Sequence, residues 1–197
     1  MLALAIGQGV AVRPARRDDI AALVQLRRRS WREAYRDILP RAEIERATGP
    51  GSADRLRRAF EGRLRGQRLL VAERPGQGLL GYAWCGPQPI RTLDHPGEIY
   101  ELYLDPDAQR RGVGSRLLDA AIWSLIDLSL HPVLVWVLAQ NPARYFYEMR
   151  GGVIVAKGTI RVGDYVTTRV AYSWSESLPL PFSQQVRGDR DGLVSRL

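Results

Sequence analysis

Residues 99–115 read Ile-Tyr-Glu-Leu-Tyr-Leu-Asp-Pro-Asp-Ala-Gln-Arg-Arg-Gly-Val-Gly-Ser, and this stretch decides the fold of the 197-residue chain. The apolar and aromatic residues up to Leu104 predict a strand, and Asp105-Pro106 predicts a turn after it. A glycine-containing loop then leads into apolar residues on one helical face, which predicts a helix from Gly114 to about Leu128. A strand that passes through a short loop straight into a helix is typical of α/β domains.

The loop between this strand and this helix has the features of an anion site. Backbone N–H groups at the start of a helix point at a bound anion, and the helix dipole favours negative charge there. Gly112 and Gly114 permit a close approach of the backbone, and Arg110 and Arg111 can add charge-assisted hydrogen bonds. The loop therefore predicts a pyrophosphate site, with an ordinary glycine-containing turn as the alternative.

Two common phosphate motifs are excluded. The dinucleotide-binding fingerprint needs a third glycine at the position of Leu117, and a P-loop needs Lys-Ser or Lys-Thr after its glycines. The site would therefore belong to another class of phosphate-binding loop.

The rest of the chain predicts elements in the order β-α-α-β-β-β-α-β-α-β-β. Strands are expected at Val10–Arg13, Arg68–Glu73, Leu79–Cys85, Glu98–Leu104, Val133–Leu138, Val153–Ile160 and Tyr165–Trp174. A first helix is expected after a cap at Asp18 or Asp19 and is expected to stop before Pro40. Further helices are expected over a second stretch broken at Gly49-Pro50-Gly51, over 114–128 and over Pro142–Arg150. This order predicts one α/β domain at 1–174, with a central mixed, twisted sheet of about six to seven strands flanked by helices. A polar tail without periodicity follows at 175–197.

Composition excludes several classes of protein. The longest apolar runs, such as Val133–Ala139, are too short to span a bilayer, so no membrane partner is expected. His95 and His131 lie far apart in the sequence, so no metal site is expected. Cys85 is the single cysteine, which fits a reducing, cytoplasmic location.

The net charge of +8 is concentrated in the first part of the chain. Residues 1–75 hold 17 arginines against 9 acidic residues, and the remaining residues are balanced. Arg27-Arg28-Arg29 is interpreted as a solvated helix face, or as a basic rim that attracts an anionic substrate or cofactor phosphates. Nucleic-acid binding is disfavoured, because the arginines fall on amphipathic helices without interleaved aromatic residues.

Four segments of the chain carry a family resemblance. Gln109–Gly114 resembles the Gln/Arg-x-x-Gly-x-Gly/Ala pattern of the GNAT (general N-acetyltransferase) superfamily, and Leu102–Pro106 resembles the central strand and turn of that family. Asn141–Glu148 resembles its segment that ends in Phe-Tyr-Glu, and Ser30–Tyr35 resembles one bacterial branch. Gly152 departs from the pattern, because it stands where the family usually has phenylalanine.

The resemblance implies an acyl-CoA-dependent N-acyltransferase, with acetyl-CoA as the expected co-substrate and a primary amine as the direct acceptor. It implies that two parallel strands splay apart and that the pantetheine arm of coenzyme A lies in the opening. By their places in the motifs, the residues expected to contact pantetheine are Leu102, Tyr103, Leu104 and Asn141. Those expected around the pyrophosphate are Gln109, Arg110, Arg111, Gly112, Val113, Gly114 and Ser115.

The same resemblance makes Tyr147 the expected general acid, with simple packing as the alternative. A phenol with a pKa of about 10 can protonate a thiolate whose thiol has a pKa of about 8.5. Glu101 is the favoured general base. Glu98 is its rival, and the two would point to opposite faces unless the strand contains a bulge. A water chain also stays open as the route for the proton. Cys85 has no paired base nearby in the sequence, so an inert thiol is expected.

The acceptor stays open between small-molecule amines and amines of peptides or proteins. Trp31 and Tyr35 lie four residues apart on the first helix and are expected either to line the acceptor side or to pack in the core. A non-catalytic acyl-CoA-binding sensor or partner module of the same fold is the alternative function. A homodimer that pairs strands of the late hairpin is also open.

Overall fold

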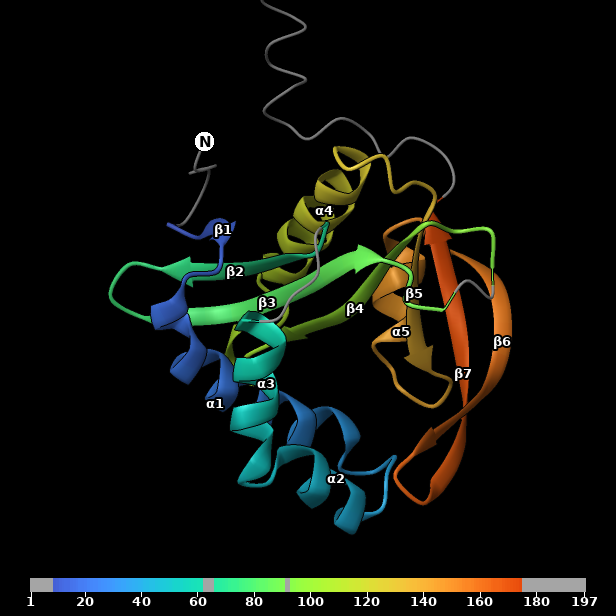
Figure 1. Cartoon of the computed structure of the whole chain (residues 1–197), viewed down its shortest axis with the longest axis horizontal. Coiled ribbons are helices and arrows are strands. Elements are labelled where there is room, and N and C mark those ends of the chain that lie inside the picture. Colours follow the sequence, from blue (N-terminus) through green and yellow to red (C-terminus); the bar gives the residue numbers. More distant parts are fainter. Residues whose placement is uncertain (1–8, 62–65, 91–92, 175–197) are drawn as a thin grey trace, which may run out of the picture.

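A seven-stranded mixed sheet in the order β1-β2-β3-β4-β5-β7-β6 forms the centre of the computed structural model (Figure 1). The structure describes residues 9–61, 66–90 and 93–174, so the predicted tail at 175–197 lies outside the described residues. The strands are β1 (Ala11–Pro14), β2 (Arg68–Arg74), β3 (Gly78–Pro87), β4 (Gly97–Leu104), β5 (Val133–Leu138), β6 (Val153–Val162) and β7 (Tyr165–Trp174). Only the β4–β5 pair is parallel. The predicted α/β fold class and strand number are confirmed.

Helices cover both faces of this sheet. They are α1 (Ile20–Tyr35), α2 (Arg41–Thr48), α3 (Gly51–Glu61), α4 (Val113–Ile126) and α5 (Arg144–Met149). Figure 1 shows α1, α2 and α3 grouped at the bottom of the view and α4 at the top. The predicted break in the second helical stretch separates α2 from α3. A Cβ on Gly49 would lie 2.8 Å from the carbonyl oxygen of Glu45, so a side chain there would clash with the last turn of α2.

The two larger apolar clusters of the core lie on opposite faces of the sheet. Leu117, Leu118 and Ile122 of α4 are fully buried against the strands in the larger cluster. Leu23 of α1 and Tyr82 of β3 belong to the second cluster. Each fully buried side chain of this size contributes about 1.5–3 kcal/mol of hydrophobic free energy. The face toward α4 is called the α4 face below, and the opposite one the α1 face.

Strands β4 and β5 stop pairing part-way along their length. Their register runs only from Gly97 opposite Val133 to Ile99 opposite Val135. Beyond this point β4 stays paired with β3, and β5 stays paired with β7. Between β3 and β4 the register jumps from Trp84 opposite Glu101 to Cys85 opposite Ile99. Tyr100 is therefore the extra residue of a β-bulge, located where the two parallel strands separate.

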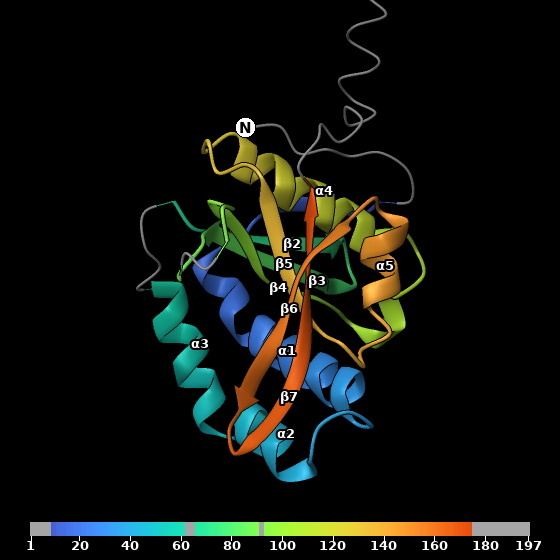
Figure 2. The same cartoon turned by 90° about the vertical axis from the view of Figure 1, so that its right-hand side faces the viewer.

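The long β6–β7 hairpin reaches down to α2, as Figure 2 shows from the side. Glu43 of α2 is 6% exposed and accepts hydrogen bonds from the backbone N–H of Asp164 and from Arg46. Gly163 at the hairpin turn has φ +60°, and a Cβ there would lie 1.8 Å from a carboxylate oxygen of Glu43. The hairpin turn is thus fixed against α2 by a contact that only glycine permits.

The departure at Gly152 has a packing reason. A Cβ at this position would meet the carbonyl oxygen of Tyr147 at 2.9 Å and the indole ring of Trp174 at 3.0 Å. The Trp174 indole also donates to the carbonyl of Arg150 at 2.9 Å. An aromatic side chain from β7 therefore occupies the space beside Gly152.

Candidate active site

The loop before α4 is built as an anion cradle. Gly112 is the N-cap of α4 with φ +77°, and no side chain caps the helix. Arg110 also has a positive φ of 58°, which is uncommon for a residue with a side chain. Left-handed residues in a loop turn successive N–H groups toward the same side, where they can meet an anion. The first N–H groups of α4 therefore face the loop without a capping side chain.

Positions 112 and 114 of the loop require glycine for different structural reasons. A Cβ on Gly112 would meet no atom within 4 Å, so this position needs glycine for its backbone conformation and leaves open space in front of the helix. A Cβ on Gly114 would lie 3.3 Å from Leu104 and 3.5 Å from Phe146. Gly114 is therefore needed because α4 packs closely on β4 and α5.

Beyond the bulge, the backbone of β4 has hydrogen-bond partners on only part of its two edges. Leu102, Tyr103 and Leu104 have β3 on one side and no β5 partner on the other. Ser30 of α1 donates to the carbonyl oxygen of Leu104 at 2.7 Å. The free edge expected for the pantetheine arm thus exists, although one of its carbonyls already has a hydrogen bond from within the protein.

Tyrosine side chains and Asn141 gather beside this free edge. Tyr35 of α1 and Tyr103 of β4 share a hydrogen bond of 2.9 Å. Burial raises the pKa of Tyr35, while hydrogen bonds from Tyr103 and Asn141 lower it. Asn141 is 6% exposed, and its Oδ1 accepts from the backbone N–H of Ala143 at 2.9 Å. The structure thus brings together residues that the sequence placed on α1, β4 and the segment after β5.

Tyr147 lies in the same region. Its side chain is 6% exposed, and its ring packs against Phe146, Tyr172 and Trp174. Burial raises the pKa of its phenol well above the ordinary value of 10, and the neighbouring Tyr35 adds to the shift. A buried phenol with a raised pKa stays protonated at neutral pH, so Tyr147 carries its proton there, although the same shift makes it a weaker acid.

The carboxylate of Glu101 is held by a basic and a phenolic partner. The guanidinium of Arg27 on α1 donates to both of its oxygens at 3.1–3.3 Å, and the hydroxyl of Tyr82 donates at 2.5 Å. Arg27 also donates to the carbonyl of Ala47 and stacks over Trp31 at 4.8 Å. Glu101 therefore joins α1, β3 and β4 in one partly buried network, which occupies its lone pairs.

Glu98 is the freer of the two candidate carboxylates. The bulge at Tyr100 turns its side chain to the same face as Glu101, because Ile99 between them packs in the cluster on the α4 face. Burial raises the pKa of Glu98 to about 6, and the charge of Arg169 opposes this shift. In a regular strand Glu98 and Glu101 would point to opposite faces. The bulge that was considered as the exception is present at Tyr100, so both side chains point to the same face. At pH 7 Glu98 is largely ionised and can accept a proton.

A family model described as "Acetyltransferase (GNAT) family" matches residues 20–152. The chain belongs to this family. It is 27% identical over 168 residues to "Uncharacterized N-acetyltransferase YuaI" of Bacillus subtilis (strain 168). This match covers 85% of the chain and 94% of that relative. It is 38% identical over 86 residues to the mycothiol acetyltransferase of Pseudarthrobacter chlorophenolicus, but this match covers 42% of the chain and only 26% of that relative.

Solved structures agree on the fold. The PaiA N-acetyltransferase of Thermoplasma acidophilum, crystallised in complex with coenzyme A, superposes with a TM-score of 0.62 at 17% identity, covering 84% of this chain and 99% of that one. As a GNAT acetyltransferase, the protein is an N-acetyltransferase that uses an acyl-CoA co-substrate. The predicted membership of the GNAT superfamily is thereby confirmed.

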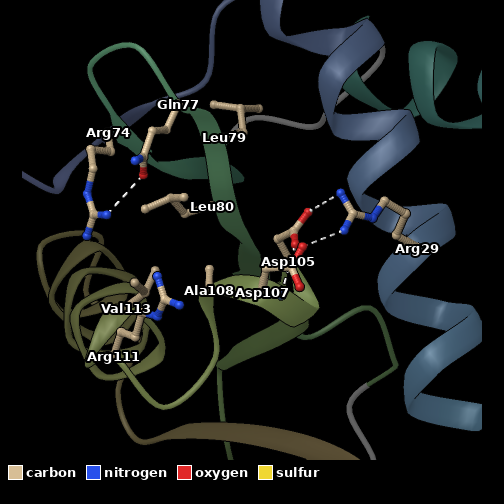
Figure 3. Close-up of a pocket in the computed structure, with 10 residues that line it drawn as sticks. All are labelled: Arg29, Arg74, Gln77, Leu79, Leu80, Asp105, Asp107, Ala108, Arg111 and Val113. Carbon is tan, nitrogen blue, oxygen red and sulfur yellow. Dashed lines mark hydrogen bonds and ion pairs between the residues drawn. The ribbon is translucent and has the colours of Figure 1, made fainter.

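A hollow of about 230 Å³ adjoins the GNAT phosphate loop on the side of β3 (Figure 3). Arg29 of α1 bridges Asp105 and Asp107 at its rim, and Arg74 donates to Gln77. Arg111 of the phosphate loop lines the hollow without a hydrogen-bond or ion-pair partner among the described residues. The tyrosines, Asn141 and both glutamates lie elsewhere, so this hollow borders the loop and does not contain the proposed chemistry.

The arginine cluster on α1 holds the helix to its neighbours. Arg27 is paired with Glu101, Arg28 donates to the carbonyl of Gly49, and Arg29 is paired with Asp105. The side chain of Arg27 is only 18% exposed, so the expectation of a solvated face is wrong for this residue. These arginine side chains bind residues that are distant in the sequence, and the local sequence pattern does not indicate such contacts.

Three further features of the described residues bear on function: the single thiol, possible metal ligands and possible membrane-spanning helices. Cys85 is buried, and burial raises the pKa of its thiol to about 12, so it is a poor nucleophile. Among the described residues, no group of three or more His, Cys, Asp or Glu side chains could hold a metal ion. Within the same residues, no helix is long and apolar enough to cross a membrane.

Proposed function

We propose that this GNAT acetyltransferase transfers an acetyl group from acetyl-CoA directly to a primary amine, with no covalent enzyme intermediate. One observation carries the proposal: β4 and β5 stop pairing at Ile99 and Val135, and the uncapped start of α4 follows β4 after a short connecting segment, residues 105–112. The free strand edge offers hydrogen bonds to an amide-bearing arm, and the helix start favours a pyrophosphate.

The residues present fit coenzyme A. The loop from Gln109 to Ser115 would hold the pyrophosphate, with Arg110 and Arg111 as added cations, and Asn141 would contact the pantetheine arm. When bound, acetyl-CoA supplies the thioester carbonyl that the amine attacks. The absence of a Cβ at Gly112 leaves the approach to the helix start open.

Two side chains would transfer protons in this reaction, one from the acceptor ammonium and one to the leaving thiolate. Glu98, rather than Glu101, is proposed as the general base, because Arg27 and Tyr82 already occupy the carboxylate of Glu101. Glu98 takes a proton from the acceptor ammonium, so that the amine has a free lone pair. Tyr147 gives a proton to the departing thiolate, since its buried phenol stays protonated.

Glu101 would act as a positioning residue in this scheme. It ties α1 to β4 through Arg27, and α1 also carries Trp31 and Tyr35. Trp31 packs on Tyr35 at 4.7 Å and on Tyr103 at 6.3 Å between ring centroids. These rings would border the acceptor and the reacting end of the pantetheine arm. A cytoplasmic location belongs to the same proposal, since Cys85 is a free thiol.

Calorimetric titration with acetyl-CoA tests the proposal, followed by measurement of CoA release with a panel of primary amines. Gly112→Val should weaken binding, because it strains a backbone at φ +77° and fills the approach to α4. Gly151→Val is the matched control, since Gly151 also has φ +77° and open space around its Cβ position. Absence of binding at millimolar acetyl-CoA would refute the proposal, and binding without turnover of any amine would favour the non-catalytic sensor.

A further inference from the structure

Among the described residues, the α1 face of the sheet carries a cation that forms no ion pair. Arg169 of β7 lies with its guanidinium 3.9 Å from the centre of the Trp136 ring. Its Nε is buried and has no hydrogen-bond partner, and no ion pair involves Arg169 among the described residues. A guanidinium stacked on an aromatic ring keeps its N–H donors in the plane of the stack, where they can bind a carboxylate with two hydrogen bonds.

Arg169 lies on the acceptor side of the sheet. Trp136 alternates along β5 with Val135 and Val137, which pack in the cluster on the α4 face. The ring of Trp136 and the guanidinium above it therefore point to the α1 face, away from the start of α4. This position makes Arg169 unsuitable for the pyrophosphate and suitable for the second substrate.

Glu98 lies across the separating strands from this cation. It is opposite Leu134 in the last paired segment of β4 and β5, and Arg169 is opposite Leu138 further along β5. Arg169 acts on the pKa of Glu98 through its charge, yet the two side chains form no ion pair. A carboxylate and a guanidinium that lie on the same face of the sheet, on either side of β5, and are not paired with each other match a ligand that carries both charges.

The surroundings of these two groups are aromatic. Trp84 of β3 and Tyr100 of the bulge pack edge to face with ring centroids 6.0 Å apart, and Trp136 borders Arg169. All three rings and both charged groups are partly exposed. Aromatic rings beside a charge pair favour an apolar or aromatic substituent on the ligand.

We propose that the acceptor of this acetyltransferase is an α-amino acid with an apolar side chain, bound with its ammonium at Glu98 and its carboxylate at Arg169. The inference rests on the proposed function, because it assigns the amine that attacks the thioester. The α-carbon holds both charged groups of such a ligand, so one small molecule can satisfy Glu98 and Arg169 together. A diamine would instead place a second cation beside Arg169, which repels it.

Matched pairs of acceptors test this assignment. CoA release is measured at saturating acetyl-CoA with each apolar proteinogenic L-amino acid and with the amine that it would give on decarboxylation, such as phenylalanine with 2-phenylethylamine. The wild-type protein should prefer an amino acid over its amine at least about tenfold in kcat/KM, since a charge-assisted carboxylate contact is lost in the amine.

Arg169→Gln is the diagnostic variant. It should raise KM for the amino acid about tenfold and abolish the preference over the amine, while acetyl-CoA binding and thermal unfolding stay unchanged. Arg169→Lys should restore part of the preference. Arg161→Gln is the control, because it removes the same charge from an exposed site on β6.

The outcomes separate this inference from the proposed function. Amines acetylated as well as their amino acids, or an Arg169→Gln variant that behaves like Arg161→Gln, would overturn the amino-acid assignment and leave the acetyltransferase intact. Acetyl-CoA binding without reaction of any member of either half of the panel would also overturn it. A protein that binds no acetyl-CoA would instead contradict the proposed function itself.

Discussion

Replacement of Glu98 by glutamine tests the proposed base with little change in side-chain size. Burial raises the pKa of Glu98 to about 6, so the wild-type carboxylate is ionised at pH 7.5 and can take a proton from the acceptor. A glutamine amide cannot accept this proton. Because a positioned general base contributes about 10²–10⁴ in rate, kcat at pH 7.5 should fall at least about a hundredfold in Glu98→Gln.

The same variant should gain stability at neutral pH. The folded pKa of Glu98 is raised from the ordinary value of 4.5 to about 6, so the folded state binds this proton more tightly than the unfolded chain does. The associated stability is present below about pH 4.5 and is lost as pH rises through about 6. A shift of this size corresponds to about 2 kcal/mol at full burial, and solvent screening of the partly exposed carboxylate reduces it to about 1 kcal/mol. Glu98→Gln should therefore be more stable than the wild type by about that amount at pH 8, and by nothing at pH 4.

The assay is the pH dependence of kcat/KM for CoA release, together with thermal unfolding at both pH values. The wild-type profile should fall on the acid side near pH 6, and the residual activity of Glu98→Gln should lack this limb. Glu45→Gln, at an exposed position of α2, is the control and should keep the wild-type profile. If Glu98→Gln keeps a wild-type acid limb and rate, the base is elsewhere, at Glu101 or in a water chain, and the reasoning fails.

Three further changes test the acid, the network on α1 and the hairpin. Tyr147→Phe should lower kcat about a hundredfold or more at every pH while thermal unfolding stays unchanged, because the ring keeps its packing; unchanged turnover would remove Tyr147 from the mechanism. Arg27→Met should lower the free energy of unfolding in denaturant titration by about 2 kcal/mol, since it strands the partly buried Glu101 carboxylate, and Arg27→Met/Glu101→Leu should recover most of this loss. Gly163→Ala should destabilise the protein by about 1–2 kcal/mol through its positive φ and its clash with Glu43, and an unaltered melting temperature would contradict the observed contact.

The regular parts of the fold could be predicted closely from the sequence. β5 and β7 begin and end at the predicted residues, because a continuous apolar run and a Gly163-Asp164 turn bound them sharply. The loop before α4 was found because glycines at a helix start leave a local pattern. Contacts between distant segments left no such pattern. Arg27 and Glu101 are 74 residues apart, and nothing in either local sequence indicates that one binds the other.

Arg169 and Trp136 show the same limit on the α1 face. Trp136 lies in β5, a strand of six residues that are all apolar. Only the observed register separates Trp136, on the α1 face, from Val135 and Val137, on the α4 face. The sequence could therefore place a strand there, but it could not indicate that an indole ring of this strand supports a guanidinium from β7.

The bulge at Tyr100 determines the face of the sheet to which Glu98 points. The spacing of the apolar residues in β4 indicates this bulge. Ile99, Leu102 and Leu104 all pack in the cluster on the α4 face, yet the first interval is three residues and the second is two. A regular strand with Leu102 and Leu104 inside would turn Ile99 outward and bury Glu98 in that apolar cluster, where an unpaired carboxylate costs several kcal/mol. One extra residue removes this conflict. It buries Ile99, turns Glu98 to the α1 face, and coincides with the end of pairing between β4 and β5. The residue pattern that avoids a buried charge thus coincides with the point where the strands separate, and it places there the carboxylate that we propose as the base.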